Sequence, residues 1–355
     1  MNKKKIIHIV SSLNVGGAER FVIDLSQDIK ETNNCVEILS FGDVNNTLWK
    51  VAEDAGIKVN TISKSSSISG QLTLFKLLSG VDVIHLHTPR VIKTLSIVLK
   101  LIGKKKLIYT RHGAADLSSS EWQSRHAKFR KYVDYMTFVS QEAMDVFTRV
   151  YLWEDIKKEV VDNGVKIPQL DQRQKSNILK IGAVGRFVEL KNQISLLKAL
   201  KKLPNDIQKN VEVHLFGDGE CEHQLKEFVN QSELEKHVTF HGMVEDRNFI
   251  YNSFDLLCVT SETEGLSLAI MEAMAFALPV LATDVGGNSK LVKHDVTGWL
   301  FDYNDVEAMV EKITWLMSNR DVMLNFGAEG REYIKNTFSI NSASKKYMSI
   351  YNCGM

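Results

Sequence analysis

Two glutamates in an apolar stretch of the chain have the residue type and the spacing to do chemistry. Residues 261–287 read SETEGLSLAIMEAMAFALPVLATDVGG, with Glu264 at the start of the apolar run and Glu272 inside it. An ionised carboxylate buried without a partner costs several kcal/mol, so each glutamate needs a partner or a ligand. A carboxylate can hold a sugar by accepting hydrogen bonds from its hydroxyls. The alternative is that Glu264 is a solvated loop residue and Glu272 an ion-paired residue at the edge of the core.

A helix is expected to start between the two glutamates. The strand-like run DLLCVTS is followed by a turn at Glu264 and Gly265, and helical spacing extends from about Leu266 to Phe276. The amides at a helix N-terminus favour an anion, and Ser267 lies beside them. Carboxylates on both sides of an anion site suit a ligand made of a sugar, a phosphate and a ribose.

Two cations in the segment GRFVELKN (185–192) favour the same ligand. Arg186 and Lys191 follow the end of another predicted strand. A charge-assisted hydrogen bond from Arg or Lys contributes about 1.5–3 kcal/mol, so the pair can neutralise a phosphate leaving group. The chain contains no Asp-x-Asp motif that would hold a metal for this task. The cations therefore favour a nucleotide-sugar site over the packing interpretation of Glu264 and Glu272.

The elements that must position these residues alternate along the chain. Short β-branched runs (IIHIV, VEILSF, VDVIHLH, KLIYTRHG and YMTFVS) are separated by helical spacing, for example at residues 19–29 and 141–151. The alternation restarts after the polar stretch KIPQLDQRQKSN at 166–177. This pattern predicts an α/β protein with two Rossmann-like, doubly wound parallel-sheet domains that face each other across a cleft. Ligands of such folds bind beyond the carboxyl ends of the strands.

Glycine-containing loops follow several of the predicted strands. NVGGAER, GRFVELKN, FGDGE and TSETEGLS each stand between a strand and a helix. Each loop alone is a weak indication, because turn geometry by itself favours glycine. No GxGxxG follows the first strand and no GxxxxGK[ST] occurs, which disfavours a dinucleotide dehydrogenase and a P-loop NTPase.

Composition and charge exclude several other classes. The 355 residues are 44% hydrophobic and 25% charged, with a net charge of +1, so we expect a soluble globular protein that does not bind nucleic acid. Four scattered cysteines favour a reducing cytoplasm over a disulfide or zinc framework. The first apolar run is too short for a signal-peptide core. Glu272 and Pro279 argue against a membrane span in the apolar stretch.

The charge is distributed unevenly along the chain. Residues 1–165 hold 23 Lys and Arg against 18 Asp and Glu, a net charge of +5, and the remainder carries −4. One interpretation is that these are solvated helix and loop faces. The other is that the front half approaches an anionic surface or substrate.

These motifs together resemble a known family. GGAE at 16–19, GRF with Lys191, FGDG at 216–219 and the Glu264-x7-Glu272 pair are similar to the retaining glycosyltransferases of family 4, which have the GT-B fold and build bacterial surface polysaccharides such as lipopolysaccharide or capsule. The resemblance implies that Glu264 contacts hydroxyls of the donor sugar and Glu272 the nucleotide ribose. It also implies that Arg186 and Lys191 bind the diphosphate.

The resemblance implies further site residues. His112, in YTRHG, would approach the transferred sugar and complete a catalytic set with Glu264, Arg186 and Lys191, although a lone histidine there can also be a hydrogen-bonding loop or core residue. Lys290 stands where the family usually has Glu, and we assign it no role. The resemblance also implies three further groups of donor-binding residues. They are glycines of the loops, two residues that follow a predicted strand, and residues at the start of the apolar helix: Gly16, Gly17, Gly185, Gly217, Gly219, Met243, Val244, Gly265, Leu266 and Ser267.

The same resemblance gives expected domain boundaries. Residues 1–165 would be an N-terminal acceptor-binding Rossmann-like domain and 166–177 a linker. Residues 178–335 would be the C-terminal domain that binds the nucleotide sugar, and 336–355 a helix that crosses back to the N-terminal domain.

The expected function is transfer of a sugar, with retained anomeric configuration, from a nucleotide-diphosphate sugar to a hydroxyl. A UDP-sugar is the expected donor, and a saccharide or polyprenyl-linked saccharide the expected acceptor. No cofactor and no metal are expected, and peripheral contact of a cytoplasmic protein with an anionic membrane would fit the basic front half. The donated sugar, the acceptor and the oligomeric state are left open by the sequence.

Three other functions compete with this one. A glycoside hydrolase could use Glu264 and Glu272 as its carboxylate pair, but it leaves Arg186 and Lys191 without a role. A nucleotide-sugar epimerase or phosphorylase could have the same two-domain fold. A non-catalytic nucleotide-sugar-binding subunit could support a partner enzyme.

Overall fold

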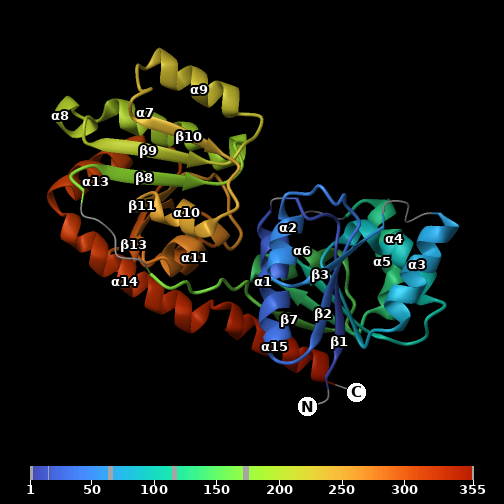
Figure 1. The fold of residues 1–355 in the computed structure, drawn as a ribbon. Helices are drawn as coiled ribbons and strands as arrows, with labels where there is room; N and C mark the ends of the chain where they lie inside the picture. The colour runs from blue at the N-terminus through green and yellow to red at the C-terminus, as the bar shows by residue number, and fades with distance from the viewer. Residues whose placement is uncertain (1–2, 15, 63–66, 114–117, 171–175, 354–355) are drawn as a thin grey trace. The chain divides into compact units, whose positions relative to one another are not determined.

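The computed structural model of the chain describes residues 3–14, 16–62, 67–113, 118–170 and 176–353, and it divides into two compact units. The first unit consists of Met1–Gly164 with Ile340–Met355, and the second of Val165–Ser339. Each unit is built on one parallel sheet flanked by helices (Figure 1). The prediction of two doubly wound α/β domains is confirmed.

The sheet of the first unit has seven strands in the order β3-β2-β1-β4-β5-β6-β7, and every neighbouring pair is parallel. Strand order reverses beside β1, so the carboxyl ends of β1 and β4 form the topological switch point, where such sheets bind ligands. The strands are β1 (Lys5–Val10), β2 (Cys35–Ser40), β3 (Lys58–Thr61), β4 (Val83–Leu86), β5 (Lys106–Arg111), β6 (Tyr135–Phe138) and β7 (Lys157–Val160).

Helices cover both faces of this sheet. Ile7 and Ile9 of β1 pack in a cluster with residues of α3 and α4, whereas Ile6 packs in a second cluster with residues of α1 and α15. Since successive side chains of a strand point to opposite faces, His8 shares the face of Ile6. The helices are α1 (Gly17–Glu31), α2 (Leu48–Asp54), α3 (Ile68–Ser79), α4 (Ile92–Leu99), α5 (Ser120–Phe129), α6 (Gln141–Val150) and α15 (Ile340–Asn352).

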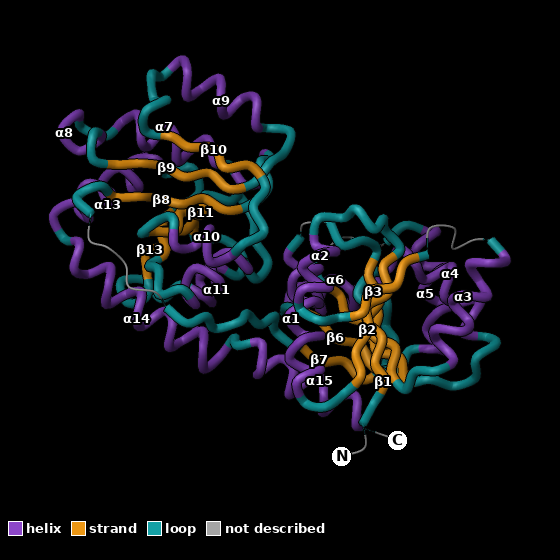
Figure 2. Tube along the Cα trace, in the orientation of Figure 1, coloured by secondary structure: helices purple, strands orange, loops and turns teal. Residues whose placement is uncertain are grey.

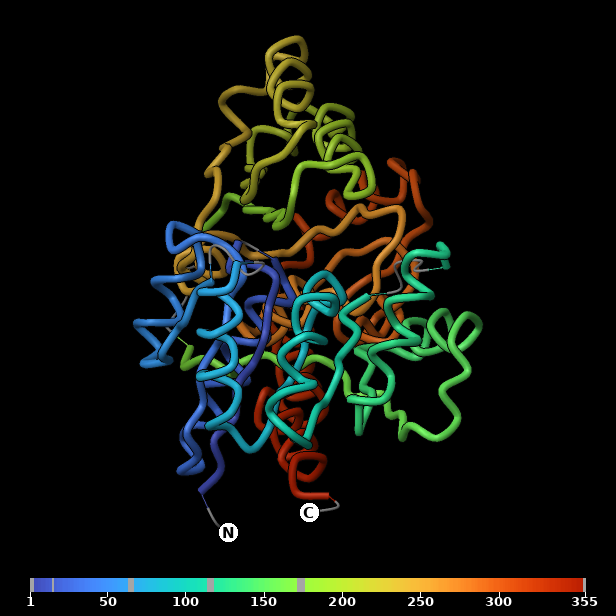
Figure 3. Tube along the Cα trace, turned by 90° about the vertical axis from the view of Figure 1, so that its right-hand side faces the viewer, coloured from blue at the N-terminus to red at the C-terminus, as the bar shows by residue number. Residues whose placement is uncertain are grey.

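The last helix of the chain belongs to the first unit. Helix α15 packs against α1, and its red segment lies beside the blue N-terminal segments in Figures 1 and 3. Tyr347 and Tyr351 of α15 are completely buried in the cluster that also holds Phe21 and Leu25 of α1. The C-terminal segment therefore supplies part of the core of the first unit.

The sheet of the second unit has six parallel strands in the order β10-β9-β8-β11-β12-β13 (Figure 2). Its switch point lies between β8 and β11. The strands are β8 (Leu179–Val184), β9 (Val211–Phe216), β10 (Val238–Gly242), β11 (Leu256–Val259), β12 (Val280–Thr283) and β13 (Gly298–Phe301), and the helices are α7 (Gln193–Lys202), α8 (Asn205–Gln208), α9 (Glu222–Gln231), α10 (Arg247–Asn252), α11 (Leu268–Ala275), α12 (Asn288–Leu291), α13 (Val306–Ser318) and α14 (Arg320–Thr337).

The apolar stretch forms a buried helix followed by a buried strand. Helix α11 begins at Leu268, two residues later than the spacing predicted, because Ser267 keeps an extended backbone as the N-cap. Five of its eight residues are buried, and every residue of β12 is buried. None of the helices in the described part of the chain combines the length and the apolarity needed to cross a membrane.

The segment predicted to be a linker is packed against the second unit at its start. Just before it, the amide of Val165 donates to the carbonyl of Phe338 over 2.9 Å, and within it the carbonyl of Pro168 accepts from Arg331 Nη2 over 2.6 Å. Residues 171–175 of the predicted linker lie outside the described residues.

Candidate active site

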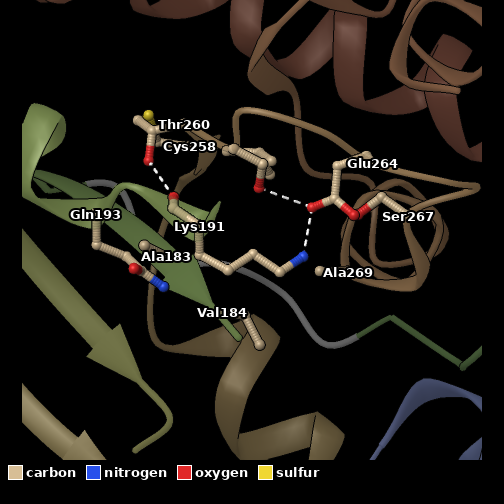
Figure 4. Close-up of a pocket in the computed structure, with 11 residues that line it drawn as sticks. Ala183, Val184, Lys191, Gln193, Cys258, Thr260, Glu264, Ser267 and Ala269 are labelled. Atoms are coloured by element: carbon tan, nitrogen blue, oxygen red, sulfur yellow. Dashed lines mark hydrogen bonds and ion pairs between the residues drawn. The ribbon is translucent and has the colours of Figure 1, made fainter. Parts of the chain in front are cut away.

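A pocket opens in the second unit at the carboxyl ends of β8 and β11 (Figure 4). These two strands flank the topological switch point, where loops after neighbouring strands diverge and leave room for a ligand. The lining residues come from β8, the loop after it, the start of α7, the end of β11, the loop after β11 and the start of α11: Ala183, Val184, Lys191, Gln193, Cys258, Val259, Thr260, Ser261, Glu264, Ser267 and Ala269.

Lys191 and Glu264 meet inside this pocket. Lys191 Nζ donates to Glu264 Oε1 over 2.5 Å, and Ser261 Oγ donates to the same oxygen over 2.8 Å (Figure 4). The Glu264 side chain is 10% exposed and that of Lys191 29% exposed. The negative charge of Glu264 is thus compensated by the Lys191 ammonium and the Ser261 hydroxyl. Both Glu264 and Lys191 remain partly exposed, so a ligand can reach them.

Backbone and side-chain hydrogen bonds fix the loop that carries Lys191. Its amide donates to the carbonyl of Val188, and the next residue, Asn192, adopts a left-handed backbone with φ 50°. Thr260 Oγ1, just past the end of β11, donates to the Lys191 carbonyl over 2.9 Å. The loops after β8 and β11 are therefore tied together, which holds the ammonium beside the carboxylate.

Two glycines after β12 support the backbone of Glu264. The amide of Gly287 donates to the Glu264 carbonyl over 3.2 Å. Gly286 has φ +51°, and a Cβ added to it would lie 1.8 Å from the same carbonyl oxygen. Only glycine fits at Gly286, because both the backbone conformation and the close approach exclude a side chain. The two glycines can be read in the sequence, but their structural role cannot.

The N-terminus of α11 lies at the pocket. Ser267, its buried N-cap, lines the pocket together with Ala269 of the first turn. The first amides of a helix have no partner within the helix, and the helix dipole gives them a partial positive charge. This end of α11 therefore adds anion-binding capacity beside Lys191.

Glu272 lies further along α11 and does not line the pocket. Arg247 Nε lies 2.8 Å from Glu272 Oε1, and Tyr251 Oη donates to Glu272 Oε2 over 2.7 Å. The Arg247 side chain is 16% exposed and that of Glu272 14% exposed. Both oxygens of Glu272 are therefore held by residues of α10. The sequence offered no reason to single out Arg247 or Tyr251, since nothing local to them marks a partner in α11.

Arg186 lies in the loop after β8, one residue past Gly185. Its side chain is exposed, and no described residue forms an ion pair or side-chain hydrogen bond with the guanidinium. A Cβ on Gly217 would lie 2.0 Å from the Gly185 carbonyl, and one on Gly219 would lie 2.4 Å from the Phe187 carbonyl. These two glycines allow the loops after β9 and β8 to pack backbone against backbone, which holds the loop that carries Arg186.

The other predicted donor-binding residues of the second unit lie near the same edge of the sheet. Met243, 37% exposed, and Val244 follow the end of β10, where Gly242 accepts a hydrogen bond from the Gly217 amide over 2.9 Å. Gly265 is exposed and Leu266 is half-buried against the core. Lys290 is exposed on α12, with Nζ 5.4 Å from the centroid of the Phe338 ring.

Three predicted site residues belong to the first unit. Gly16 is the N-cap of α1 and Gly17 its first residue, after the carboxyl end of β1. His112 follows β5, and its Nε2 lies 2.8 Å from Nδ1 of His87. Burial lowers the pKa of His112 to about 4, and the charge of Arg111 adds to this effect. His112 is therefore neutral near pH 7.

Two family profiles match consecutive parts of the chain. "Glycosyltransferase Family 4" matches residues 15–167, and "Glycosyl transferases group 1" matches residues 168–333. The chain belongs to glycosyltransferase family 4. The first match ends at residue 167, three residues after Gly164, which is the last residue of the first unit before the chain enters the second.

Curated relatives of this family-4 chain include bacterial glycosyltransferases. The UDP-Gal:alpha-D-GlcNAc-diphosphoundecaprenol alpha-1,3-galactosyltransferase of Escherichia coli is 25% identical over 315 residues, which cover 82% of this chain and 80% of that protein. The poly(ribitol-phosphate) alpha-N-acetylglucosaminyltransferase of Staphylococcus aureus is 27% identical over 193 residues, 54% of this chain and 39% of that one. An uncharacterised glycosyltransferase of Haemophilus influenzae is likewise matched over only 42% of its length.

Solved structures share the fold of this family-4 chain. Anabaena HepE in complex with UDP and glucose aligns with a TM-score of 0.82 at 20% identity, over 99% of this chain and all of that one. Staphylococcus aureus TarM, in a complex that contains UDP, aligns with a TM-score of 0.79 at 15% identity. These likenesses establish the GT-B fold.

Proposed function

We propose that this chain is a retaining glycosyltransferase that moves a sugar from a UDP-sugar to a hydroxyl of a saccharide or polyprenyl-linked saccharide. The observation that carries the proposal is the pocket in which Lys191, Glu264 and the N-terminus of α11 converge. Relatives named for transfer to a diphosphoundecaprenol-linked sugar and to poly(ribitol-phosphate) support the acceptor class. Synthesis of a cell-surface polysaccharide is the corresponding role.

Five of the predicted site residues have named parts in the proposed transfer. Glu264 accepts hydrogen bonds from donor-sugar hydroxyls, while Lys191 and Arg186 bind the diphosphate with the first amides of α11. The bond between the sugar C1 and the diphosphate oxygen breaks, and the acceptor oxygen bonds to C1 from the same face. The acceptor proton passes to the leaving diphosphate, so no covalent enzyme intermediate is required. Glu272 and His112 are proposed to contact the ribose and the transferred sugar.

Lys191 and Glu264 can exchange their mutual ion pair for contacts with the donor. Before the donor binds, each charge compensates the other, which avoids the cost of a buried unpaired charge. When it binds, the ammonium can turn to a phosphate oxygen and the carboxylate to sugar hydroxyls. Positive charge from Lys191 and Arg186 then stabilises the leaving group, as an oxyanion site does.

The hydrolase alternative finds less support at this site. A glycosidase needs two carboxyl groups that flank the scissile bond. Glu264 lines the pocket, whereas Glu272 does not and has both oxygens held by Arg247 and Tyr251. A transferase also gives Lys191 and Arg186 a role.

The test uses the purified full chain with a panel of UDP-sugars and a diphosphopolyprenyl-linked N-acetylglucosamine acceptor. UDP release and product anomers are followed by coupled assay and NMR, with and without EDTA. We expect acceptor-dependent UDP release, product with the donor's anomeric configuration, and no change with EDTA. Free sugar in place of product would indicate a hydrolase, and interconversion of UDP-sugars without acceptor an epimerase. UDP-sugar binding with no turnover would indicate a binding subunit.

We also propose peripheral contact of the protein with the anionic cytoplasmic face of a membrane, where a polyprenyl-linked acceptor would lie. The net charge of +5 on residues 1–165 supports it, since basic surfaces are attracted to anionic lipid headgroups. The chain should sediment with phosphatidylglycerol vesicles at low salt and be released as salt screens the charges. Equal sedimentation with neutral phosphatidylcholine vesicles, or none with either, would contradict the proposal.

A further inference from the structure

Two neighbouring helices of the first unit expose large apolar side chains. In α3, Ile68 is 83% exposed, Leu72 57% and Phe75 38%. Their spacing of four and three residues places all three on one side of the helix. Ile97 of α4 is 52% exposed, and Leu101, just after α4, is 68% exposed. These side chains are therefore grouped by the helices and not scattered singly over the surface.

Both helices cover the same face of the sheet. Helices α3 and α4 pack against each other, and they lie side by side in Figure 1. Leu74 of α3 and Leu95 of α4 are buried in the cluster that also holds Ile7 of β1. Since the buried side of each helix points to the sheet, the exposed apolar side chains of both helices point away from it. We call this outer surface the α3–α4 face.

Exposed lysines accompany the apolar side chains. They are Lys76 of α3, Lys93 of α4, and Lys100 and Lys104, which follow α4. Residues three or four apart are neighbours on a helix surface, so Lys76 lies beside Leu72, and Lys93 beside Ile97. The α3–α4 face is thus both apolar and basic.

Acidic residues are almost absent from this part of the sequence. From residue 62 to residue 113 the chain contains a single one, Asp82, and neither α3 nor α4 contains any. Asp82 lies just before β4, and its Oδ2 accepts a hydrogen bond from the Lys5 amide over 2.8 Å. The positive charge of the α3–α4 face is therefore left for a partner to compensate.

The combination of apolar and basic side chains favours a lipid surface as that partner. A contiguous exposed apolar patch with a polar rim marks an interaction site. In a symmetric dimer formed through this face, the lysines of two copies would lie against each other, and neither helix supplies an acidic residue to compensate. Anionic headgroups supply the opposite charge, and the acyl boundary beneath them accepts Leu, Ile and Phe side chains.

We propose that the α3–α4 face docks the protein on an anionic bilayer, with its apolar side chains at the boundary between headgroups and acyl chains and its lysines among the headgroups. The proposal rests on the proposed membrane contact and names the surface that makes it, which net charge alone leaves open. A few apolar side chains give only marginal binding by themselves. Both contributions are therefore needed, and salt still releases the protein.

The first test changes the apolar contribution and leaves the net charge as it is. Sedimentation of the full chain with phosphatidylglycerol vesicles at low salt gives the partition coefficient. Leu72→Ser and Leu101→Ser should each lower it roughly fivefold, because apolar area stays in water. Leu324→Ser on α14 is the matched control, since Leu324 is 61% exposed but belongs to the second unit. Equal partition of Leu72→Ser, Leu101→Ser and the parent protein would overturn the proposal.

The second test removes charge from two different places. Lys76→Gln with Lys100→Gln should weaken binding to the same vesicles roughly fivefold for each lysine at low salt. The matched control, Lys198→Gln with Lys236→Gln, removes the same charge from exposed positions of the second unit. The control should bind nearly as the parent protein does. Equal weakening by both pairs would show that net charge acts without a particular surface.

The third test reports where the face lies in the bilayer. Leu72→Trp and Leu324→Trp each add one indole to the five tryptophans of the chain. Quenching of tryptophan fluorescence by vesicles with brominated acyl chains should exceed that of the parent protein in Leu72→Trp but not in Leu324→Trp. No additional quenching in Leu72→Trp, in a protein that still sediments with the vesicles, would overturn the proposal.

Activity separates this proposal from the proposed function. Leu72→Ser should match the parent protein with a short, water-soluble acceptor and be roughly fivefold slower with a polyprenyl-linked acceptor held in vesicles. A parent protein that docks through this face but transfers no sugar would count against the transferase and support the docking surface. A parent protein that sediments with no vesicle would overturn both the membrane contact and the face. A dimer in solution that Leu72→Ser converts to monomers would show that a second copy covers the face instead.

Discussion

Lys191 and Glu264 are 73 residues apart in the chain, yet their side chains form an ion pair with Nζ 2.5 Å from Oε1. Each residue lies in the loop after a strand, and the two strands, β8 and β11, are neighbours in the sheet. Parallel strands present their carboxyl ends at one edge, so the sheet itself brings a cation and an anion together at the switch point. The pocket is therefore charge-balanced before a ligand enters.

The first prediction concerns this ion pair. Lys191→Ala and Glu264→Gln should each lower kcat/KM for UDP-sugar turnover by about 10²–10³-fold, because each removes a group proposed to act on the donor. The matched controls are Lys198→Ala on α7 for Lys191 and Glu262→Gln for Glu264. Each control residue has the same charge as its counterpart and an exposed side chain. The measurement is UDP release under subsaturating donor.

The double variant sharpens this prediction. Two residues in contact are expected to be non-additive, so Lys191→Ala with Glu264→Gln should cost less than the sum of the single changes. Turnover at the wild-type rate in Glu264→Gln would remove that carboxylate from the proposed site.

The second prediction concerns the support of Glu272. Tyr251→Phe removes the hydroxyl that donates to Glu272 Oε2. Loss of this bond should weaken UDP binding by about 1 kcal/mol, roughly fivefold in Kd, if Glu272 holds the ribose. Isothermal titration with UDP measures it, with Tyr303→Phe as the control at a partly exposed tyrosine. An unchanged Kd with a lowered Tm would mean that the hydroxyl serves only the fold.

The third prediction concerns the backbone beneath Glu264. Gly286→Ala should abolish most of the activity, because its Cβ would lie 1.8 Å from the Glu264 carbonyl and must displace that loop. Gly103→Ala is the control, since Gly103 also has a positive φ of +75° but no atom within 4 Å of an added Cβ. Both variants carry backbone strain of about 1–3 kcal/mol. A Gly286→Ala protein that loses no more activity than Gly103→Ala would contradict the proposed support.

The fourth prediction concerns pH. The pKa of His8 is lowered to about 3 and that of His112 to about 4, in both cases mainly by burial. The unfolded chain takes up these protons near pH 6.5, but the folded protein does not, so stability is full above that pH and falls as the pH drops toward the folded values. Each histidine should lower the free energy of unfolding by about 1.4 kcal/mol per pH unit in this window.

Urea denaturation of the full chain at pH 7.5, 6 and 5 tests this slope. His8→Asn should flatten it, whereas His223→Asn should not, because the His223 side chain is 93% exposed. Other groups near these histidines are Arg111, whose charge lowers the pKa of His112, and Tyr347 and Tyr351, whose pKa values burial raises. An equal slope in His8→Asn and the parent protein would show that carboxylates alone cause acid unfolding.

Much of the fold and part of the candidate site could be predicted from local patterns. Alternating β-branched and helical runs fix which segments become strands and helices, and strands followed by helices imply parallel sheets. Glu264 and Lys191 could be named because each follows the end of a predicted strand. The predicted start of α11 was two residues too early, because the hydrophobic pattern does not reveal that Ser267 has an extended backbone.

The tertiary structure alone decided which residues are partners. The order of strands in a sheet is a long-range property, so no local pattern could pair Lys191 with Glu264, Arg247 with Glu272, or His87 with both His8 and His112. The same holds for Gly286, whose need for a bare backbone arises from a carbonyl that another strand places against it. The sequence determined the elements and the chemical types at their ends, because these depend on neighbours along the chain. The folded structure determined which of them touch, because contact depends on how the strands are ordered in space.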